Sequence, residues 1–507
     1  MSGPGRSVRQ SMAWLHTWSG LVIGWVLFAI FVTGTASYYR AEVSHWMRPE
    51  LSETAVDPSA AATRAAAYLG RVMPDAMAWS VRLPTVETPQ VEVYWWKNPG
   101  GPYHHALLDP TTGEPSRARD TKGGDFLYRF HFELALPSMW GRWIVGICAM
   151  ILLVSLITGI VTHRRIFADF FTFRRDRSAQ RGWLDAHNVF GVLALPFHLM
   201  IVYTGLIELG PMLMPWGVKA AYQHDVLAYY AESGIMAAAR KPAGRPGIQS
   251  PLGEIVARAT ADGGEPPEVV MVTMPGDAAS SVTAFFEEPP GLAHLHPQIV
   301  YAGDTGTELS RTGEAGGATR TGAVMIGLHE AHFAAAPLRI LFFLCGVMGA
   351  ATIASGLVLW TVARMPKGAN PAGFGLRLVR VLNLGTIAGL PTGLAAYFLA
   401  NRLLPLDLAA RADWEVRAFF GAWILSAVAS TLLPSAKAWP AGLSAAALAF
   451  VAIPVVDAVT VGQTRFLGFD AAMLAVAILL AIGARFANRR PGRVWAAKPA
   501  LSRTVEA

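Results

Sequence analysis

The feature that most constrains this chain is a series of long apolar runs. Eight of them occur among 507 residues, 53% of which are hydrophobic and only 15% charged. A hydrocarbon core of about 30 Å is crossed by roughly 20 helical residues, and a helix satisfies its own backbone hydrogen bonds there. We therefore predict a membrane protein, an all-α bundle with eight transmembrane helices. The predicted spans are 10–39, 139–165, 187–210 and 336–363, followed by a C-terminal four-helix membrane block at 376–486.

Arginines in the short connections predict the orientation. Six of them lie within 164–181, and such residues collect on the cytoplasmic side of a membrane. The basic loop 166–186, the tail 487–507 and both termini are therefore predicted to be cytoplasmic, in the inner membrane of a bacterial cell. The long segments 40–138 and 211–335 are then periplasmic. Topology accounts for the net charge of +7, so we expect the lipid bilayer, and no nucleic acid, as a partner.

An internal repeat organises the first four spans. A Thr-Gly pair follows His16, with its glycine 18 residues after the histidine, and another follows His187 at the same spacing. Cys148 and Cys345 likewise each precede a glycine by 11 residues. We predict a pseudo-two-fold repeat in which each half carries one small α+β domain. The helix-like stretches are 58–72 and 251–261, and the strand-like runs are 77–83, 90–96, 103–109, 268–274, 280–286 and 297–302.

Histidines cluster in and beside these four spans. Intramembrane ionisable residues are costly and indicate function, and imidazoles from facing helices bind haem iron from both sides. We predict two haem b groups, the inner one on His16 and His187. The outer one is predicted on His131 with either His332 or His329, because two alignments of the repeat compete. The complete candidate set is His16, His131, His163, His187, His198, His329 and His332.

Two of these histidines have no partner in the repeat. His198, near the middle of its span, is interpreted either as a ligand or relay, or as a hydrogen-bonding residue between helices. His163 is either a ligand or an interfacial residue. The remaining histidines, including His294 and His296, are expected on the surface of the outer domains, with metal binding as the alternative.

Several motifs resemble the PepSY-associated transmembrane family, also described as iron-regulated membrane proteins, some of whose members are siderophore reductases. They include LHTWSGLVIGW at 15–25, FLYRFHFEL at 126–134 and WLDAHNVFGVLALPFHLMIVYTGL at 183–206. The resemblance covers about residues 10–365 and includes all seven candidate histidines. It implies a haem-bearing inner-membrane bundle with two PepSY-like periplasmic domains.

These observations favour an oxidoreductase that passes electrons through two haems and reduces a ferric siderophore in the periplasm, releasing Fe²⁺ for uptake. No GxGxxG fingerprint follows a strand, so the electron donor is expected to be a cytoplasmic protein or a quinol. Aromatic residues of the outer segments are either docking or core residues: Trp79, Tyr94, Trp95, Trp96 and Tyr301. The alternatives are a PepSY-type regulatory or sensory protein and a transporter of iron or haem.

Overall fold

The computed structural model forms two compact units, which are described separately. Unit 1 comprises residues 1–49, 120–206 and 334–507, and unit 2 comprises 50–119 and 207–333. The described residues are 7–51, 56–85, 88–98, 103–163, 179–223, 225–236, 240–365, 373–433, 435–462 and 466–489. Most of the predicted loop 166–186 and of the predicted tail 487–507 lies outside these ranges.

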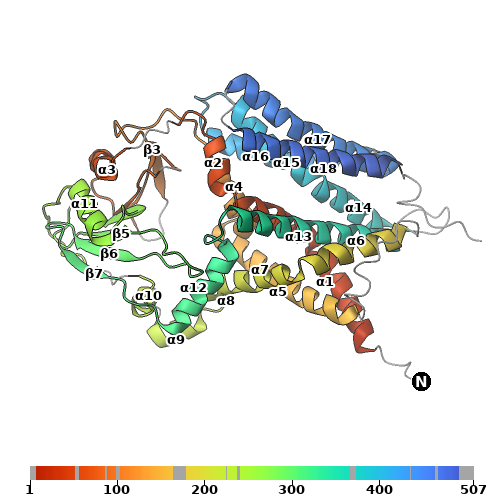
Figure 1. Ribbon diagram of the computed structural model, residues 1–507, viewed down its shortest axis with the longest axis horizontal. Helices are drawn as coiled ribbons and strands as arrows, with labels where there is room; N and C mark the ends of the chain where they lie inside the picture. Colours follow the sequence, from red (N-terminus) through yellow and green to blue (C-terminus); the bar gives the residue numbers. More distant parts are fainter. Residues whose placement is uncertain are drawn as a thin grey trace, which may run out of the picture. The chain divides into compact units, whose positions relative to one another are not determined.

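Unit 1 is built from long apolar helices (Figure 1). Seven helices among the described residues are long and apolar enough to cross a membrane, or eight if one bent pair counts as a single span. This supports the predicted membrane location. The helices are α1 (Val8–Ser37), α5 (Ser138–Thr162), α13 (Ala336–Ala363), α14 (Phe374–Ile387) continued by α15 (Gly389–Leu403), α16 (Arg411–Leu432), α17 (Ser435–Thr460) and α18 (Leu467–Arg489).

The bent pair falls on the predicted third span, 187–210. Helix α6 (Ala179–Leu193) and helix α7 (Leu195–Glu208) meet at an angle of 66°. Pro196 is the second residue of α7, and a proline ring has no amide hydrogen and clashes with the preceding turn of a continuous helix. The span expected there is thus broken just before the proline.

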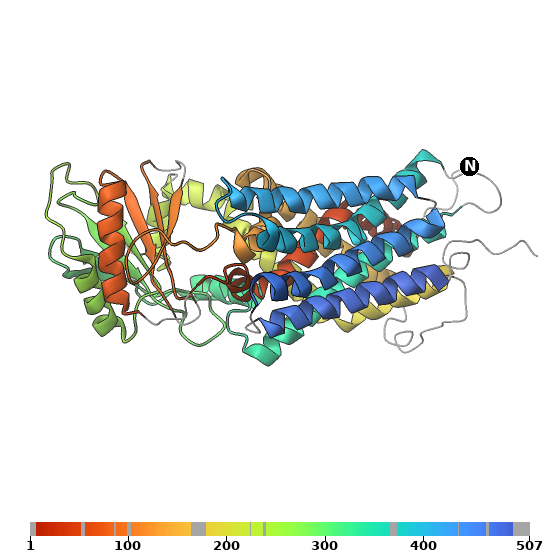
Figure 2. The same ribbon diagram turned by 90° about the horizontal axis from the view of Figure 1, so that it is seen from above.

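The helices of unit 1 form two connected groups. Helix α1 packs on α5 and α13, and α13 also packs on α6. Helices α15 to α18 pack on one another and run side by side (Figure 2). Asn383 of α14 links the groups, because its side chain accepts from Trp25 of α1 at 2.8 Å and donates to the Leu357 carbonyl of α13 at 3.0 Å.

Two short helices of unit 1 matter for the site. Helix α2 (Arg40–Trp46) follows α1 directly, and helix α4 (Gly123–Glu133) precedes α5. Phe126 and Phe130 of α4 stack edge-on against Phe419 of α16, with ring centroids 5.2 and 5.6 Å apart. The C-terminal block therefore packs directly on α4.

Unit 2 contains one seven-stranded antiparallel sheet in the order β3-β2-β1-β4-β5-β6-β7. Six strands lie within the six predicted runs, and β7 was not predicted. Helices α3 (Pro58–Val72) and α11 (Leu252–Gly263) lie side by side against one face of the sheet (Figure 2). The strands are β1 (Ala78–Arg82), β2 (Val91–Trp96), β3 (His104–Leu108), β4 (Val269–Thr273), β5 (Ser281–Phe285), β6 (Gln298–Ala302) and β7 (Glu308–Arg311).

The two α+β domains expected from the sequence are joined into this single sheet. Strand β1 pairs antiparallel with β4, and Ser80 faces Met271 at the middle of the pair. The strand order is therefore palindromic around β1 and β4 for three strands on each side. Local patterns predicted the strands, but a pairing between residues so far apart in the chain has no local signal.

The candidate aromatic side chains lie on two different faces of the sheet. Trp79, Trp95 and Tyr301 lie in the core beneath α3 and α11. Tyr94 is half-buried, alternates with Trp95 along β2 and so points to the other face, where it stacks on His105 at 5.4 Å. The first three are thus core residues.

The rest of unit 2 consists of short helices, α8 (Gly210–Leu213), α9 (Trp216–Tyr222) and α10 (Val226–Glu232), and the longer α12 (Gly317–Glu330). A loop from 287 to 297 joins β5 to β6. It lies against α12, because the amide of His294 donates to the Ala323 carbonyl at 3.0 Å.

Candidate functional site

The structure brings together the two histidines that the repeat pairs. His16 on α1 and His187 on α6 lie with their ring centroids 6.1 Å apart and their planes at 65°. Helices α1 and α6 both pack on α13, so α13 fixes the separation at which the two rings meet.

Each of these rings makes the same backbone contact. Nδ1 of His16 lies 2.8 Å from the Ser155 carbonyl of α5, and Nδ1 of His187 lies 2.8 Å from the Thr352 carbonyl of α13. A carbonyl only accepts, so Nδ1 of a neutral imidazole carries the proton and Nε2 keeps its lone pair. Both rings are thereby held in the tautomer that binds a metal through Nε2.

Glycines admit the rings to this position. A Cβ atom on Gly159 would lie 3.2 Å from Cε1 of His16, and one on Gly356 would lie 3.0 Å from Cε1 of His187. Such separations are tight for carbon atoms, so a side chain at either position would press on the imidazole. These are the glycines that the sequence repeat places 11 residues after Cys148 and Cys345.

The separation of the rings fits two ligands on one metal ion. A metal–imidazole bond of about 2.0 Å on each side, plus the distance from nitrogen to ring centre, puts the two centroids about 6 Å apart. The observed 6.1 Å is close to this value, and it is also the distance of an edge-on contact between two rings. Two neutral imidazoles are also the donor set that holds a low-spin haem iron. The donor types and the ring spacing are therefore compatible with the group that the sequence predicts.

His131 lies at a second level along α1. Its Nδ1 is 2.8 Å from the Ile30 carbonyl, and a Cβ atom on Gly34 would overlap its ring. Burial lowers the pKa of His131, although the hydrogen bond to Ile30 opposes this effect, so the ring is neutral at physiological pH. Fourteen residues separate His16 from Ile30, which is about 21 Å along a helix axis.

His163 and His198, the two candidates without a counterpart in the repeat, have their Nε2 atoms directed to protein groups. Nε2 of His163 lies 2.9 Å from the side-chain nitrogen of Asn188, which can donate to it. Nε2 of His198 lies 3.3 Å from the Cys345 carbonyl, and its ring meets Phe31 edge-on. These contacts are typical of residues that link helices.

His329 and His332 lie in unit 2, at and just after the end of α12. Nε2 of His332 is 2.8 Å from a carboxylate oxygen of Glu330. Burial alone would raise the pKa of Glu330, but the hydrogen bond from His332 and the neighbouring imidazoles lower it below its ordinary value. The pairing of His131 with either histidine stays a prediction.

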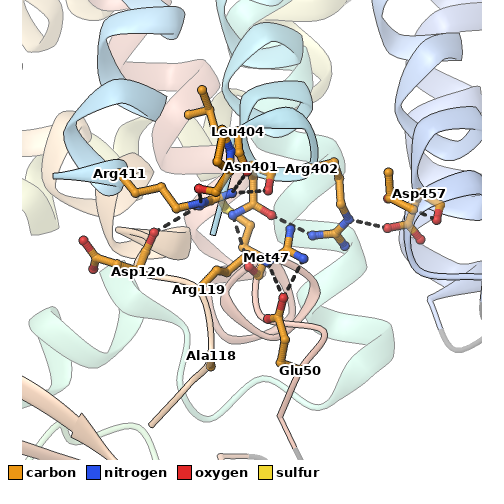
Figure 3. Close-up of polar contacts among 12 residues, drawn as sticks. Met47, Glu50, Ala118, Arg119, Asp120, Asn401, Arg402, Leu404, Arg411 and Asp457 are labelled. Atoms are coloured by element: carbon orange, nitrogen blue, oxygen red, sulfur yellow. Dashed lines mark hydrogen bonds and ion pairs between the residues drawn. The ribbon is translucent and has the colours of Figure 1, made fainter. Parts of the chain in front are cut away.

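A buried polar network in unit 1 was not predicted (Figure 3). Arg402 and Asp457 form an ion pair at 2.5 Å with side chains 0% and 1% exposed, and Arg411 pairs with Glu415 at 2.5 Å. Asn401 donates to Glu415 at 2.8 Å and accepts from Arg402 at 2.6 Å, and so connects the pairs. The available signal was the presence of Arg402 and Asp457 in otherwise apolar runs.

This network holds the segments that flank the histidine helices. Arg402 donates to the Trp46 carbonyl at 2.6 Å, and Asn401 donates to the Met47 carbonyl at 3.1 Å. Arg411 donates to the Asp120 carbonyl at 3.1 Å, immediately before α4. The C-terminal block thus fixes the end of α2 and the start of α4, the helix that carries His131.

Comparison with known proteins agrees with this architecture. Residues 13–363 match the family model described as the PepSY-associated TM region, and the chain belongs to this family. A relative from Pseudomonas aeruginosa, described as "Uncharacterized protein PA4219", is 28% identical over 337 residues, which cover 62% of this chain and 81% of the relative.

Proposed function

We propose that this chain is an inner-membrane electron-transfer protein with two haem b groups that reduces a ferric siderophore in the periplasm. The observation that carries the proposal is the pair formed by His16 and His187. Their rings are 6.1 Å apart, and a backbone carbonyl fixes each Nδ1 proton. Hydrogen bonding of this kind orients a ligand and raises its basicity.

In this proposal His16 and His187 would hold the inner haem. His131 would hold the outer haem with His329 or His332. Bound haem would supply one-electron chemistry, and ligation by two imidazoles would favour electron transfer over oxygen binding. The spacing of about 21 Å along α1 separates the two levels. Electrons would come from a cytoplasmic donor or a quinol.

The reaction needs one electron per iron. Fe³⁺ held by hard oxygen ligands takes up one electron and becomes Fe²⁺, which such ligands hold less tightly. The siderophore then releases Fe²⁺ for uptake. The outer segments would bind the chelate, which is the partner on that side of the membrane.

A reduced-minus-oxidised absorption spectrum of the purified chain tests the proposal. We expect a sharp α-band and two haems per chain, and about half of the haem lost in His16→Ala or His187→Ala. His105→Ala serves as a control, because this exposed ring lies on the sheet of unit 2. No α-band in the wild-type chain would overturn the proposal and favour a regulator or a transporter.

Reduction itself is measured in liposomes that contain the chain. A quinol or dithionite reduces the haems, and a ferric siderophore is added to the other side together with a chromogenic Fe²⁺ chelator. We expect reoxidation of the haem band and Fe²⁺ formation, both lost in His187→Ala. A band that stays reduced would refute reductase activity while leaving haem binding intact.

A further inference from the structure

Unit 2 contains a cluster of imidazoles and carboxylates beside the end of α12. Glu288, His294 and His296 come from the loop between β5 and β6, whereas Glu330 and His332 come from the end of α12. The His294 ring lies 5.2 Å from both the His296 ring and the His332 ring. Segments far apart in the sequence therefore converge on one point.

Three of these side chains have the spacing of a metal site. One ligand atom from each of Glu288, His294 and His332 lies within 4.8 Å of the other two. Glu330 adds a carboxylate oxygen 3.7 Å from Nδ1 of His294. His296 places Nε2 3.4 Å from Oε1 of Glu288.

Two atoms at the centre of the cluster contact each other directly. Oε1 of Glu288 and Nδ1 of His294 form a close ion pair, and within the described part of the chain both atoms are buried. A metal ion that both atoms bind would take the place of the proton that they share.

The surroundings prepare the cluster for a ligand. Nδ1 of His296 lies 3.0 Å from the Phe286 carbonyl, which assigns the proton to Nδ1 and turns the Nε2 lone pair towards Glu288. A Cβ atom on Gly327 would overlap the Leu292 carbonyl, so this glycine lets the loop approach α12 closely. The loop and the helix are thus held together without any ion.

We infer that Glu288, His294 and His332 bind a divalent first-row transition-metal ion, with Glu330 and His296 as neighbouring donors. Mixed imidazole and carboxylate donors suit Zn²⁺ and Fe²⁺, whereas Mg²⁺ and Ca²⁺ prefer oxygen ligands alone. Two carboxylates balance the charge of such an ion. The proton that His332 shares with Glu330 leaves when the metal binds.

This inference does not depend on the proposed function. It does assign His332 to a site other than a haem, which leaves His329 for the predicted pairing with His131. If the proposed function holds, the Fe²⁺ that is released belongs to the class of ion that this donor set binds.

The test measures Zn²⁺ and Co²⁺ binding to the full chain in detergent after treatment with a chelator. We expect one Zn²⁺ per chain, competition between Zn²⁺ and Co²⁺, and a Co²⁺ absorption spectrum with imidazole ligation. Glu288→Gln and His294→Ala should each weaken Zn²⁺ binding at least about tenfold. Glu287→Gln is the matched control, because this neighbouring carboxylate is exposed and should bind Zn²⁺ like the wild type.

Unchanged Zn²⁺ binding in both Glu288→Gln and His294→Ala would overturn the inference, as would equal loss in Glu287→Gln. His332→Ala should weaken Zn²⁺ binding and keep the wild-type haem content; loss of haem with intact Zn²⁺ binding would overturn its assignment. Thermal unfolding of each variant verifies that it is folded. Zn²⁺ is measured whether or not haem is present, so failure of the proposed function would not mimic failure of this site.

Discussion

The strongest test of the packing concerns the buried ion pair between Arg402 and Asp457. The two side chains are 0% and 1% exposed and lie 2.5 Å apart, between α15 and α17. Arg402 also donates to the carbonyl of Trp46, whose ring its guanidinium covers at 3.7 Å. Asp457→Asn keeps the shape of the side chain and removes its charge, so a guanidinium stays buried without a counter-ion.

The expected loss in the free energy of unfolding is about 3 kcal/mol. Removing one partner of a buried ion pair costs about 3–5 kcal/mol, and the lower value applies because the asparagine oxygen can still accept from Arg402. The control is Asp413→Asn, which breaks the pair with Lys122. Those side chains are 53% and 47% exposed, and exposed pairs contribute about 0–1 kcal/mol because water screens them.

Equilibrium unfolding in detergent, followed by tryptophan fluorescence, measures both variants against the wild type. We expect Asp457→Asn to lower the midpoint clearly and Asp413→Asn to leave it nearly unchanged. Equal shifts of the midpoint in the two variants would refute the reasoning. They would show that burial does not determine how much an ion pair contributes to the free energy of unfolding.

Three further predictions concern the site and its surroundings. Gly34→Ala should displace His131 and lower the haem content by one group. The control is Gly421→Ala, whose added Cβ meets no atom within 4 Å and which should keep both haem groups. Pyridine haemochrome assays count the haem, and equal haem content in the two variants would contradict the role of Gly34. Burial would raise the pKa of Glu133, but hydrogen bonds from one serine and two arginines lower it below the ordinary 4.5. The stability that this carboxylate contributes to the folded protein is therefore complete above pH 4.5 and is lost as the pH falls through the folded pKa. Glu133→Gln should therefore unfold with less dependence on pH in that acid range, and parallel acid-unfolding curves would argue against this. His163→Ala should retain the wild-type α-band, because Nε2 faces a side-chain amide; a halved band would identify it as a ligand.

The sequence predicted the elements that depend on local patterns. Six of the seven strands and helices α3 and α11 fall where alternating or helical apolar patterns occur. Strand β7 was missed because its residues, ELSR, do not alternate between apolar and polar side chains as a half-buried strand does. The break before Pro196 was also missed, because proline is tolerated in the first turn of a helix and is frequent in membrane spans.

The candidate site was predictable only where a repeat marked it. His16 and His187 stood out because the same spacing occurs twice, and the structure places their rings together. The network around Arg402 was invisible because most of its partners are backbone carbonyls, which leave no pattern in a sequence. The cluster at Glu288 and His294 escaped for another reason. Its members come from a loop and a helix end, whose approach depends on the tertiary fold.

The pairing of β1 with β4 has a consequence for how the chain is made. Strand β1 ends at Arg82 and its partner β4 begins at Val269, so the ribosome adds about 190 residues before β1 can pair with β4. This takes roughly 10 to 40 s of synthesis. During that time the first three strands have an open edge that can pair with another chain. The nascent protein is therefore exposed to aggregation during this interval, and a chaperone that covers strand edges would act on β1 before β4 exists.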